Sequence, residues 1–481
     1  MKSLLVTKYL HDAPTLAKLL KKQPESYWIL RGERHILKVF QAMTKRVPAY
    51  EDFLKKNSVK PSSIKTIADF KRVPLTDKEN YLQTYPLEKL AWDGKFKEHR
   101  WLISSTSGST GEPFYFPRTT DQEEQFQLTA ELCLREYFEI HKRSTLFIDC
   151  FALGVWIGGM FMYQAIKNLI NTEKYQLSMI TPGADKVETL KVMRKLAHHF
   201  DQIIIGGYAP LVKDLVDDGI AQGIDWKKYR MKYFFAAEGF TETFRDYIAK
   251  HGGAENIHTD LINHYGTADL GTMAHETPVT IAARRSGMFD ENHQTPTVCQ
   301  FIPELFFFEA IDGVLACSGL GGLPLMRYDL KDRGGIRMLK DVPHKKGSWN
   351  LPLVYLYERA DFTVSIYSVN IYPASIRRAL EDKALRKTLS GKFSMRVDFD
   401  KGQNQFLEIN VELRPGQTSN KNLEKTTLDA MLASLNRENS EWRDFYVNPG
   451  IRHKVIPRLV FWPYQDPTYF RPGGKQKWIK K

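Results

Sequence analysis

The stretch IIIGGYAP at residues 203–210 constrains the fold of this chain more than any other. An uninterrupted apolar run closed by a glycine pair is typical of a strand buried on both faces of a sheet, and Pro210 suits the first turn of a following helix. The stretches MKYFFAAEG at residues 231–239 and DLINHYG at residues 260–266 have a similar form. These repeated strand–helix units predict an α/β fold.

The polar residues that close these strands indicate where a site would lie. In open α/β sheets, ligands bind beyond the carboxyl ends of the strands. Glu238 follows one predicted strand, and the segment 265–269 follows the next. We therefore expect both to lie where the chemistry occurs.

The pattern changes along the chain and predicts two domains. Residues 1–100 are mostly helical in pattern and form an α-rich lead-in to a large N-terminal α/β domain, residues 1–358. Beyond that point, residues 393–413 alternate apolar and polar side chains on both sides of Lys401-Gly402, which is a hairpin signal. With a helix starting at Pro373, this predicts a smaller C-terminal α+β domain, residues 359–481.

Charge and cysteine content restrict the possible partners and the cellular compartment of the protein. The 481 residues carry a formal net charge of +13, which suits nucleic acid or anionic lipid as a partner but equally suits a protein that handles phosphates or carboxylates. The 4 cysteines show no CxxC spacing, so a disulfide scaffold and a structural zinc site are weakly supported. The N-terminus lacks the apolar core of a signal peptide. Together these features predict a cytoplasmic protein.

Residues 145–166, TLFIDCFALGVWIGGMFMYQAI, are about long enough to cross a bilayer. Asp149 and the glycines argue against a membrane span, and a buried strand, loop and helix give the same pattern. We therefore predict no membrane span. As a buried segment, this stretch would line an apolar substrate pocket, with Phe151 and Trp156 among its side chains.

A turn rich in hydroxyl side chains and glycines directs attention to phosphate. Glycines allow the positive φ angles with which successive backbone N–H groups converge on an anion, and hydroxyl groups add further donors. The stretch is not the GxxxxGK[ST] phosphate loop, because Glu112 stands where the lysine would be. The candidate anion-binding residues are Thr106, Ser107, Gly108, Ser109, Thr110 and Gly111.

Six stretches in this order resemble the signature motifs of the adenylate-forming (ANL) superfamily, and most closely its phenylacetate:CoA ligase branch. No single motif is specific, but the order and spacing of all of them are, and the likeness covers almost the whole chain. The stretches are TSGSTGEP at 106–113, AAEG at 236–239, HYGTADLG at 264–271, LPLMRYDLKD at 323–332, ERADFTVSIYSVNIYP at 358–373 and PGGKQKW at 472–478.

The resemblance implies roles for individual residues around the nucleotide. Residues 106–111 match the loop that holds the ATP phosphates, and Glu238 falls in a stretch near the nucleotide. Tyr265 matches the aromatic residue that stacks on adenine, with Gly266 letting the backbone approach. Asp332 matches the acid that holds the ribose hydroxyls.

The resemblance also implies a metal ligand and a moving domain. Asp269 takes the place of the glutamate that binds Mg²⁺, and a carboxylate is a suitable hard ligand for that ion. Arg359 and Asp361 match the stretch between the domains, where the aspartate is the hinge about which a mobile C-terminal domain turns. Lys475 matches the lysine that reaches the carboxylate and the α-phosphate during adenylation.

Three departures from the family pattern bear on activity. Glu112 reverses a charge beside the β and γ phosphates. Ala268 removes a hydroxyl group that would bond to the α-phosphate, unless Thr267 supplies one. Ser368 stands where the branch usually has glycine, near the approach of the acceptor thiol, which leaves coenzyme A open as the acceptor.

The resemblance implies an enzyme of the acyl-CoA synthetase type. It would activate a carboxylic acid with ATP and Mg²⁺ as an acyl-adenylate, release pyrophosphate, and pass the acyl group to a thiol, coenzyme A being the default of the branch. The apolar segment favours an apolar or aromatic acid. Some relatives bind zinc after the Tyr-Gly motif, but only His275, His293 and Cys299 are available here, so we predict no zinc.

Three alternatives stay open. An adenylate-forming ligase or transferase with an amine, a hydroxyl group or a carrier protein as acceptor would share nearly every motif. A degenerate, non-catalytic nucleotide-binding protein would explain Glu112 and Ala268, although Lys475 argues against it. A basic nucleic-acid binder is the third, and the sequence favours it least. The acid and the oligomeric state are not fixed by the sequence.

Overall fold

The computed structural model describes residues 12–105, 114–291, 295–344, 347–359, 363–470 and 479. The chain divides into two compact units, and each is described by itself below. Unit 1 holds most of the chain up to Glu358, and unit 2 holds Arg359–Lys481.

Unit 1 is built on a mixed sheet, as an α/β fold predicts. In the described part of the chain this sheet has 11 strands in the order β10-β11-β12-β13-β9-β8-β7-β6-β5-β3-β4. Strands β4, β3, β5, β6 and β7 pair in parallel, while β8 pairs antiparallel with β7 and opens the antiparallel half. Their bounds are β3 (Thr145–Asp149), β4 (Leu177–Ile180), β5 (Gln202–Gly207), β6 (Met231–Ala236), β7 (Leu261–Thr267), β8 (Gly271–His275), β9 (Thr297–Gln300), β10 (Phe306–Ile311), β11 (Val314–Gly319), β12 (Leu325–Arg337) and β13 (Leu353–Arg359).

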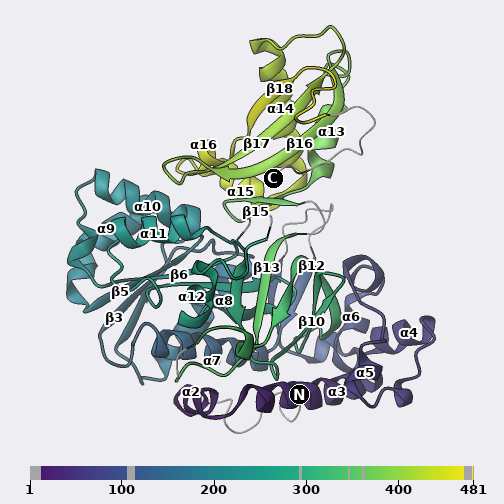
Figure 1. Ribbon diagram of the computed structural model, residues 1–481, viewed down its shortest axis with the longest axis vertical. Helices are drawn as coiled ribbons and strands as arrows, with labels where there is room; N and C mark the ends of the chain where they lie inside the picture. Colours follow the sequence, from purple (N-terminus) through teal and green to yellow (C-terminus); the bar gives the residue numbers. More distant parts are fainter. Residues whose placement is uncertain are drawn as a thin grey trace. The chain divides into compact units, whose positions relative to one another are not determined.

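Helices connect and cover the parallel strands. Helices α9, α10 and α11 lie beside one another next to β3, β5 and β6 (Figure 1), joined by the Lys186–Asp218 ion pair and by the Tyr247 hydroxyl donating to Asp217. A short hairpin, β1 (Leu102–Ser105) and β2 (Tyr115–Arg118), precedes α7. The helices are α7 (Thr120–Glu136), α8 (Ile157–Asn171), α9 (Lys186–Leu196), α10 (Ala209–Ala221), α11 (Glu242–His251) and α12 (Pro278–Arg285).

The strand IIIGG is buried along its length, as its composition predicts. Residues Ile203, Ile204 and Ile205 are all 0% exposed. A Cβ atom on Gly206 would lie 2.8 Å from Cζ of Phe147 and 3.3 Å from Cε2 of Phe151. Glycine at this position therefore leaves room for two aromatic rings on the neighbouring strand and its loop.

The apolar stretch 145–166 is a strand, a loop and a helix rather than a single helix. It covers β3, the loop that ends at Trp156, and the first part of α8. Within the described ranges, no helix combines the length and the apolar composition needed to cross a membrane.

The lead-in segment is helical in its described part and packs against the rest of unit 1. Helix α3 has Gly32 where a Cβ atom would lie 2.6 Å from Pro303, so only glycine permits this close approach. The Asn350 N–H donates to the Leu20 carbonyl over 2.8 Å. The lead-in helices are α2 (Ala13–Lys22), α3 (Glu25–Arg46), α4 (Pro48–Lys56), α5 (Ile67–Phe70) and α6 (Leu87–Leu90).

Unit 2 is a small α+β fold. Strands β16 (Leu389–Phe399) and β17 (Gln405–Leu413) pair antiparallel, which confirms the predicted hairpin. Strand β18 (Arg458–Trp462) adds in parallel to β17. The other elements are β14 (Val364–Ile366), β15 (Val369–Ile371), α13 (Pro373–Leu380), α14 (Lys421–Glu438), α15 (Ser440–Val447) and α16 (Arg452–Val455).

Candidate functional site

The residues predicted for a nucleotide site are described to three different extents. One group belongs to unit 1 and is described in full: Glu238, Tyr265, Asp269 and Asp332. Of Arg359, only the backbone is described, at the end of β13. Those outside the described residues are Thr106, Ser107, Gly108, Ser109, Thr110, Gly111, Asp361 and Lys475.

Tyr265 and Asp332 come together although 67 residues separate them. The Tyr265 hydroxyl donates to Oδ2 of Asp332 over 2.6 Å, and both residues are buried. Strands β8, β9 and β13 stand between β7 and β12 in the hydrogen-bonded order. Since neighbouring strands lie about 4.8 Å apart, a flat sheet would hold these two strands roughly 19 Å from each other. The sheet therefore bends strongly between them and brings two predicted nucleotide residues into contact.

The ring of Tyr265 packs against another aromatic ring, that of Phe308. It lies nearly parallel to the ring of Phe308, with centroids 6.1 Å apart and planes 27° apart. Tyr265 is 7% exposed. Stacking on Phe308 and the hydroxyl bond to Asp332 thus fix the orientation of the ring. A flat ligand would find this orientation already formed before it binds.

The turn that carries Glu238 is tied to strand β7. Ala237 has a φ angle of 73°, which alanine rarely adopts, and Glu238 is 8% exposed. The Asn263 side chain donates from Nδ2 to the Glu238 carbonyl over 3.0 Å. This bond joins the turn after β6 to the strand that leads into Tyr265. The sequence analysis passed over Asn263, although a polar residue inside an apolar strand was a visible signal.

The segment from Gly266 to Asp269 forms the tight turn between β7 and β8. A Cβ atom on Gly266 would lie 2.6 Å from the Gly271 carbonyl, so the hairpin itself requires glycine. The Leu270 N–H donates to Oγ1 of Thr267 over 3.2 Å. That hydroxyl group still has its own hydrogen to donate. Asp269 is half-buried in the same turn.

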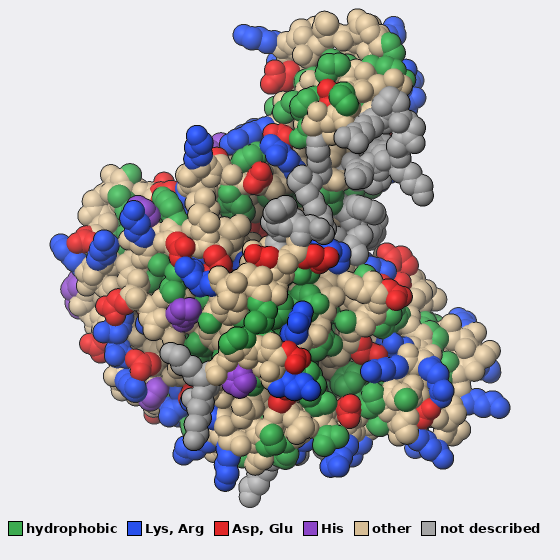
Figure 2. Space-filling view, viewed as in Figure 1, with side chains coloured by type: hydrophobic (Ala, Val, Ile, Leu, Met, Phe, Trp, Pro, Cys, Tyr) green, Lys and Arg blue, Asp and Glu red, His purple; other side chains and the backbone are tan. Residues whose placement is uncertain are grey.

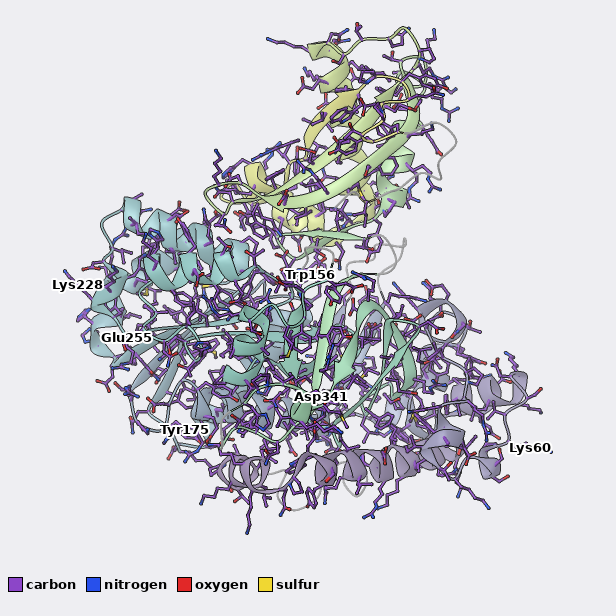
Figure 3. All side chains as sticks on the ribbon, in the orientation of Figure 1. Lys60, Trp156, Tyr175, Lys228, Glu255 and Asp341 are labelled. Carbon is purple, nitrogen blue, oxygen red and sulfur yellow. The ribbon has the colours of Figure 1, made fainter. Side chains whose placement is uncertain are left out.

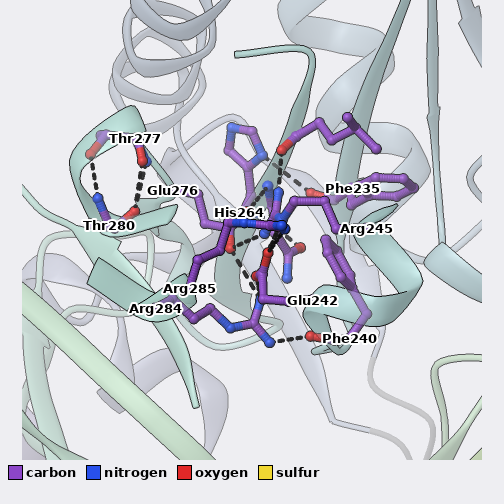
Figure 4. A network of polar contacts seen from close by, with 12 residues as sticks. Phe235, Phe240, Glu242, Arg245, His264, Glu276, Thr277, Thr280, Arg284 and Arg285 are labelled. Atoms are coloured by element: carbon purple, nitrogen blue, oxygen red, sulfur yellow. Dashed lines mark hydrogen bonds and ion pairs between the residues drawn. The ribbon is translucent and has the colours of Figure 1, made fainter. Parts of the chain in front are cut away.

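A buried ionic cluster contacts both the turn after β6 and strand β7. Arg245 and Glu276 are both 0% exposed, and their side chains are 2.6 Å apart (Figure 4). The other oxygen of Glu276 accepts from the Asn263 N–H over 2.8 Å. Arg284 lies 3.5 Å from Glu276 and donates to the Phe240 carbonyl. The cluster therefore holds both the turn after β6 and the strand β7.

The segment predicted to line an acid pocket is buried. Phe151 is 1% exposed, and Trp156, labelled in Figure 3, is 8% exposed where it precedes α8. From the same segment, Phe161 stacks on Phe126 of α7 with centroids 3.9 Å apart. Arg118 lies over the Phe161 ring at 5.1 Å. These rings form an apolar layer between α7 and α8.

Asp149 is a second unusual group at the carboxyl end of a parallel strand. It is 0% exposed, and its Oδ1 accepts from the Phe151 N–H over 3.1 Å. Its Oδ2 has no hydrogen-bond partner among the described residues. Burial raises the pKa of Asp149 to about 7, against the lowering effect of the Phe151 N–H. The group therefore keeps its proton in mildly acidic solution.

The residues present fit a Mg²⁺ ion that takes some of its ligands from the protein and the others from a substrate. Nowhere in the described part of the chain do three His, Cys, Asp or Glu side chains gather as a complete metal site requires. Mg²⁺ is commonly bound by one or two carboxylates plus substrate phosphates, and Asp269 could provide such a carboxylate. Of the residues weighed for zinc, His293 lies outside the described ranges. The absence of zinc stays a prediction.

The chain is similar in sequence to known enzymes. No family model matches the chain. The chain is 22% identical over 354 residues to a phenylacetate–coenzyme A ligase of Thermus thermophilus, covering 72% of this chain and 74% of that one. It is 21% identical over 374 residues to the phenylacetate–coenzyme A ligase of Aromatoleum evansii, covering 77% and 78%.

Solved structures agree on the fold. A 2-hydroxyisobutyryl-CoA ligase in complex with 2-HIB-AMP and CoA matches with a TM-score of 0.67 and 14% identity, over 96% of this chain and 91% of that chain. An open conformation of the same ligase matches with a TM-score of 0.53 and 15% identity, over 96% and 93%. The predicted α/β fold and the predicted resemblance are both confirmed. The chain is thus distantly similar in sequence to phenylacetate–coenzyme A ligases, as the resemblance to the adenylate-forming (ANL) superfamily predicts, and it shares the fold of a 2-hydroxyisobutyryl-CoA ligase.

Proposed function

We propose that this enzyme activates a carboxylic acid with ATP as an acyl-adenylate, releases pyrophosphate, and passes the acyl group to a thiol, with coenzyme A as the acceptor. The observation that carries the proposal is the hydrogen bond between Tyr265 and Asp332. It joins the two residues proposed for adenine and ribose, which lie on strands far apart in the sheet order. A shared nucleotide explains why both belong at one place.

The nucleotide would rest on preformed groups. The Tyr265 ring offers a flat apolar face to the adenine base, and Gly266 leaves the backbone beside it exposed. A carboxylate has about four lone-pair positions, so Asp332 can accept from ribose hydroxyls as well as from Tyr265. Glu238, fixed by Asn263, would lie near the nucleotide.

The adenylation step joins two anions, and the site must offset their charge. A carboxylate oxygen of the acid attacks the α-phosphorus, and pyrophosphate leaves with the electron pair of the broken P–O bond. The backbone N–H groups of residues 106–111 and the ammonium group of Lys475 would stabilise the charge, and the Thr267 hydroxyl would donate to the α-phosphate in place of the residue lost at Ala268. Mg²⁺ held by Asp269 would neutralise phosphate charge.

The second half-reaction requires that Lys475 withdraw. The resemblance supports a rotation about Asp361, beside Arg359, that removes the lysine and admits the acceptor. The thiolate then attacks the acyl carbon, and AMP leaves. A carrier protein thiol or an amine would use the same geometry, and the acceptor is therefore the part of the proposal that needs its own measurement.

The charge distribution supports small anionic substrates over nucleic acid. On the face drawn in Figure 2, Lys and Arg side chains are interspersed with Asp and Glu rather than gathered into one basic stripe. Nucleic-acid binding relies on such a stripe. The net charge of +13 is thus compatible with a protein that handles ATP and coenzyme A.

Pyrophosphate exchange into ATP tests the proposal directly. The assay uses Mg²⁺ and a panel of aryl, fatty and hydroxy acids, with the Lys475→Ala variant beside the unaltered protein. We expect exchange that depends on one class of acid and collapses in the variant. If no acid supports exchange although ATP binds, the enzyme does not adenylate acids, and a nucleotide-binding role takes its place.

A further inference from the structure

A small internal cavity lies under helix α7, between it and the central strands of unit 1. Its volume is about 10 Å³, and most of its lining is apolar, including Phe126 from α7 and Phe301 after β9. Two histidines also line it, His264 from β7 and His275 from β8. A polar pair inside an apolar cavity calls for a partner.

His264 presents a hydrogen-bond acceptor that the protein leaves unused. The residue is 6% exposed, and its Nδ1 lies 3.2 Å from the Phe235 carbonyl. A carbonyl oxygen only accepts, so Nδ1 carries the hydrogen and the Nε2 of the neutral ring can only accept. In the described part of the chain, this buried Nε2 has no hydrogen-bond partner.

His275 lies beside His264 on the neighbouring strand β8. It is 5% exposed, and its buried Nε2 likewise has no partner among the described residues. Its ring lies 5.6 Å from that of His264, with the planes 22° apart, and meets the edge of Trp349. Burial lowers the pKa of His275 to about 4, and burial together with His275 lowers the pKa of His264 well below its ordinary value. Both rings are therefore neutral at pH 7.

The chemistry and the size of the cavity restrict what it takes. An unpaired buried acceptor costs about 1–3 kcal/mol, which a donor group would recover. A cavity of about 10 Å³ holds one oxygen-sized group. No carboxylate lines the cavity, so an ammonium group would be buried without a counter-charge. A hydroxyl group fits all three restrictions, whether it belongs to a ligand or to a water molecule.

The cavity adjoins the proposed reaction site. His264 directly precedes Tyr265 on β7, so its side chain lies on the opposite face of the strand that carries the proposed adenine residue. Thr272, which also lines the cavity, pairs with Gly266 across the β7–β8 hairpin. The lining residue Phe126 stacks on Phe161 of the segment proposed for the acid pocket. Among the substrates of the proposed reaction, the acid is therefore the one whose proposed pocket lies beside the cavity.

We propose that this cavity is a subsite for one hydroxyl group of the acid, and that His264, beside His275, is a specificity-determining residue whose Nε2 accepts from it. The proposal rests on the proposed function and adds the substrate class to it: a hydroxy acid. The hydroxyl group donates to one imidazole and enters the cavity alone, while the rest of the acid stays outside.

Matched pairs of acids test this subsite in the pyrophosphate-exchange assay. Each pair consists of an acid and its hydroxylated form, with the hydroxyl group on the chain or on a ring. We expect kcat/KM for one hydroxylated acid to exceed that of its partner at least ~10-fold, as the loss of one hydrogen bond to a buried acceptor implies. The His264→Leu variant is expected to reduce the preference below about 3-fold.

Two further variants distinguish the loss of the acceptor from misfolding of the protein. His264→Gln keeps an acceptor on a side chain of similar length, and we expect it to retain part of the preference. His198→Leu, on an exposed histidine of the same unit, is the control and should keep all of it. Their substrate preferences are compared with that of His264→Leu only if the thermal unfolding midpoints of the variants agree.

The outcomes separate this proposal from the one on which it rests. Exchange with no preference for any hydroxylated acid would overturn the subsite while adenylation stands, and an ordered water between the imidazoles in a crystal structure would then identify the true occupant. A preference that His264→Leu leaves intact would overturn it too. Exchange with no acid at all would instead refute adenylation itself.

Discussion

The Glu276→Gln substitution should destabilise unit 1 strongly, because it removes a buried negative charge without changing the shape of the side chain. Glu276 and Arg245 are both 0% exposed and 2.6 Å apart. Removing one partner of a buried pair typically costs about 3–5 kcal/mol, since the other charge stays buried without compensation. Glu242 lies 3.0 Å from both Arg245 and Arg284 and remains as a partner, so we expect the lower end, about 3 kcal/mol.

The same cluster offers a matched control at its surface. Arg285 and Asp246 are 2.9 Å apart, but their side chains are 31% and 53% exposed. Exposed pairs contribute only about 0.2–1 kcal/mol. The Asp246→Asn variant makes the same carboxylate-to-amide change and should therefore shift stability by less than about 1 kcal/mol.

Urea unfolding followed by pulse proteolysis measures the difference, because the fragments report on unit 1 separately. With a denaturant slope of about 3 kcal/mol/M, a loss of 3 kcal/mol lowers the midpoint by about 1 M. The shift should persist in 0.5 M salt, as screening acts mainly on exposed charges. A midpoint for Glu276→Gln within about 0.3 M of the unaltered protein, or one equal to that of Asp246→Asn, would refute the reasoning.

Three further predictions concern single residues. The folded-state pKa of Asp149, about 7, lies above its ordinary 3.8, so the unfolded chain ionises first and the free energy of unfolding falls as pH rises from about 4 to 7, by up to about 4 kcal/mol. Asp149→Asn should remove this loss, and parallel pH–stability curves for the two proteins would contradict the prediction. Ser368→Gly should stabilise unit 2 by up to about 1 kcal/mol in thermal unfolding, because Ser368 has a φ of 67°, and an unchanged or lower midpoint would show that its backbone is not strained. Tyr265→Phe removes the donor to Asp332 and should weaken AMP binding about 10-fold by calorimetry, whereas equal affinity would separate this bond from the nucleotide.

The sequence predicted the elements that depend on local pattern. The strand at Ile203–Gly207 was visible because an apolar run that a glycine pair closes needs no distant partner to be recognised. The hairpin around Lys401-Gly402 and the helix from Pro373 were visible for the same reason. The order of short motifs then indicated the superfamily, which comparison with known proteins confirms.

The features that depend on distant contacts were not predictable from one sequence. Nothing local shows that Arg245 and Glu276, 31 residues apart, form a buried pair, because either residue alone is typical of a solvated surface. The roles of Asn263 and His264 depend equally on what the fold places beside them. The resemblance implied a role for Tyr265 and for Asp332, but it did not predict the contact between them, which requires the bend of the sheet.

That bend has a consequence for how the protein acquires its activity. The contact between Tyr265 and Asp332 joins residues 67 positions apart on strands that are not neighbours in the sheet order, and contacts of this kind form late because the intervening loops must close first. A chain that has folded only its parallel strands would hold Tyr265 without Asp332. Binding of AMP would then appear only when the antiparallel half has docked, and nucleotide affinity would serve as a reporter for the last step in the folding of unit 1.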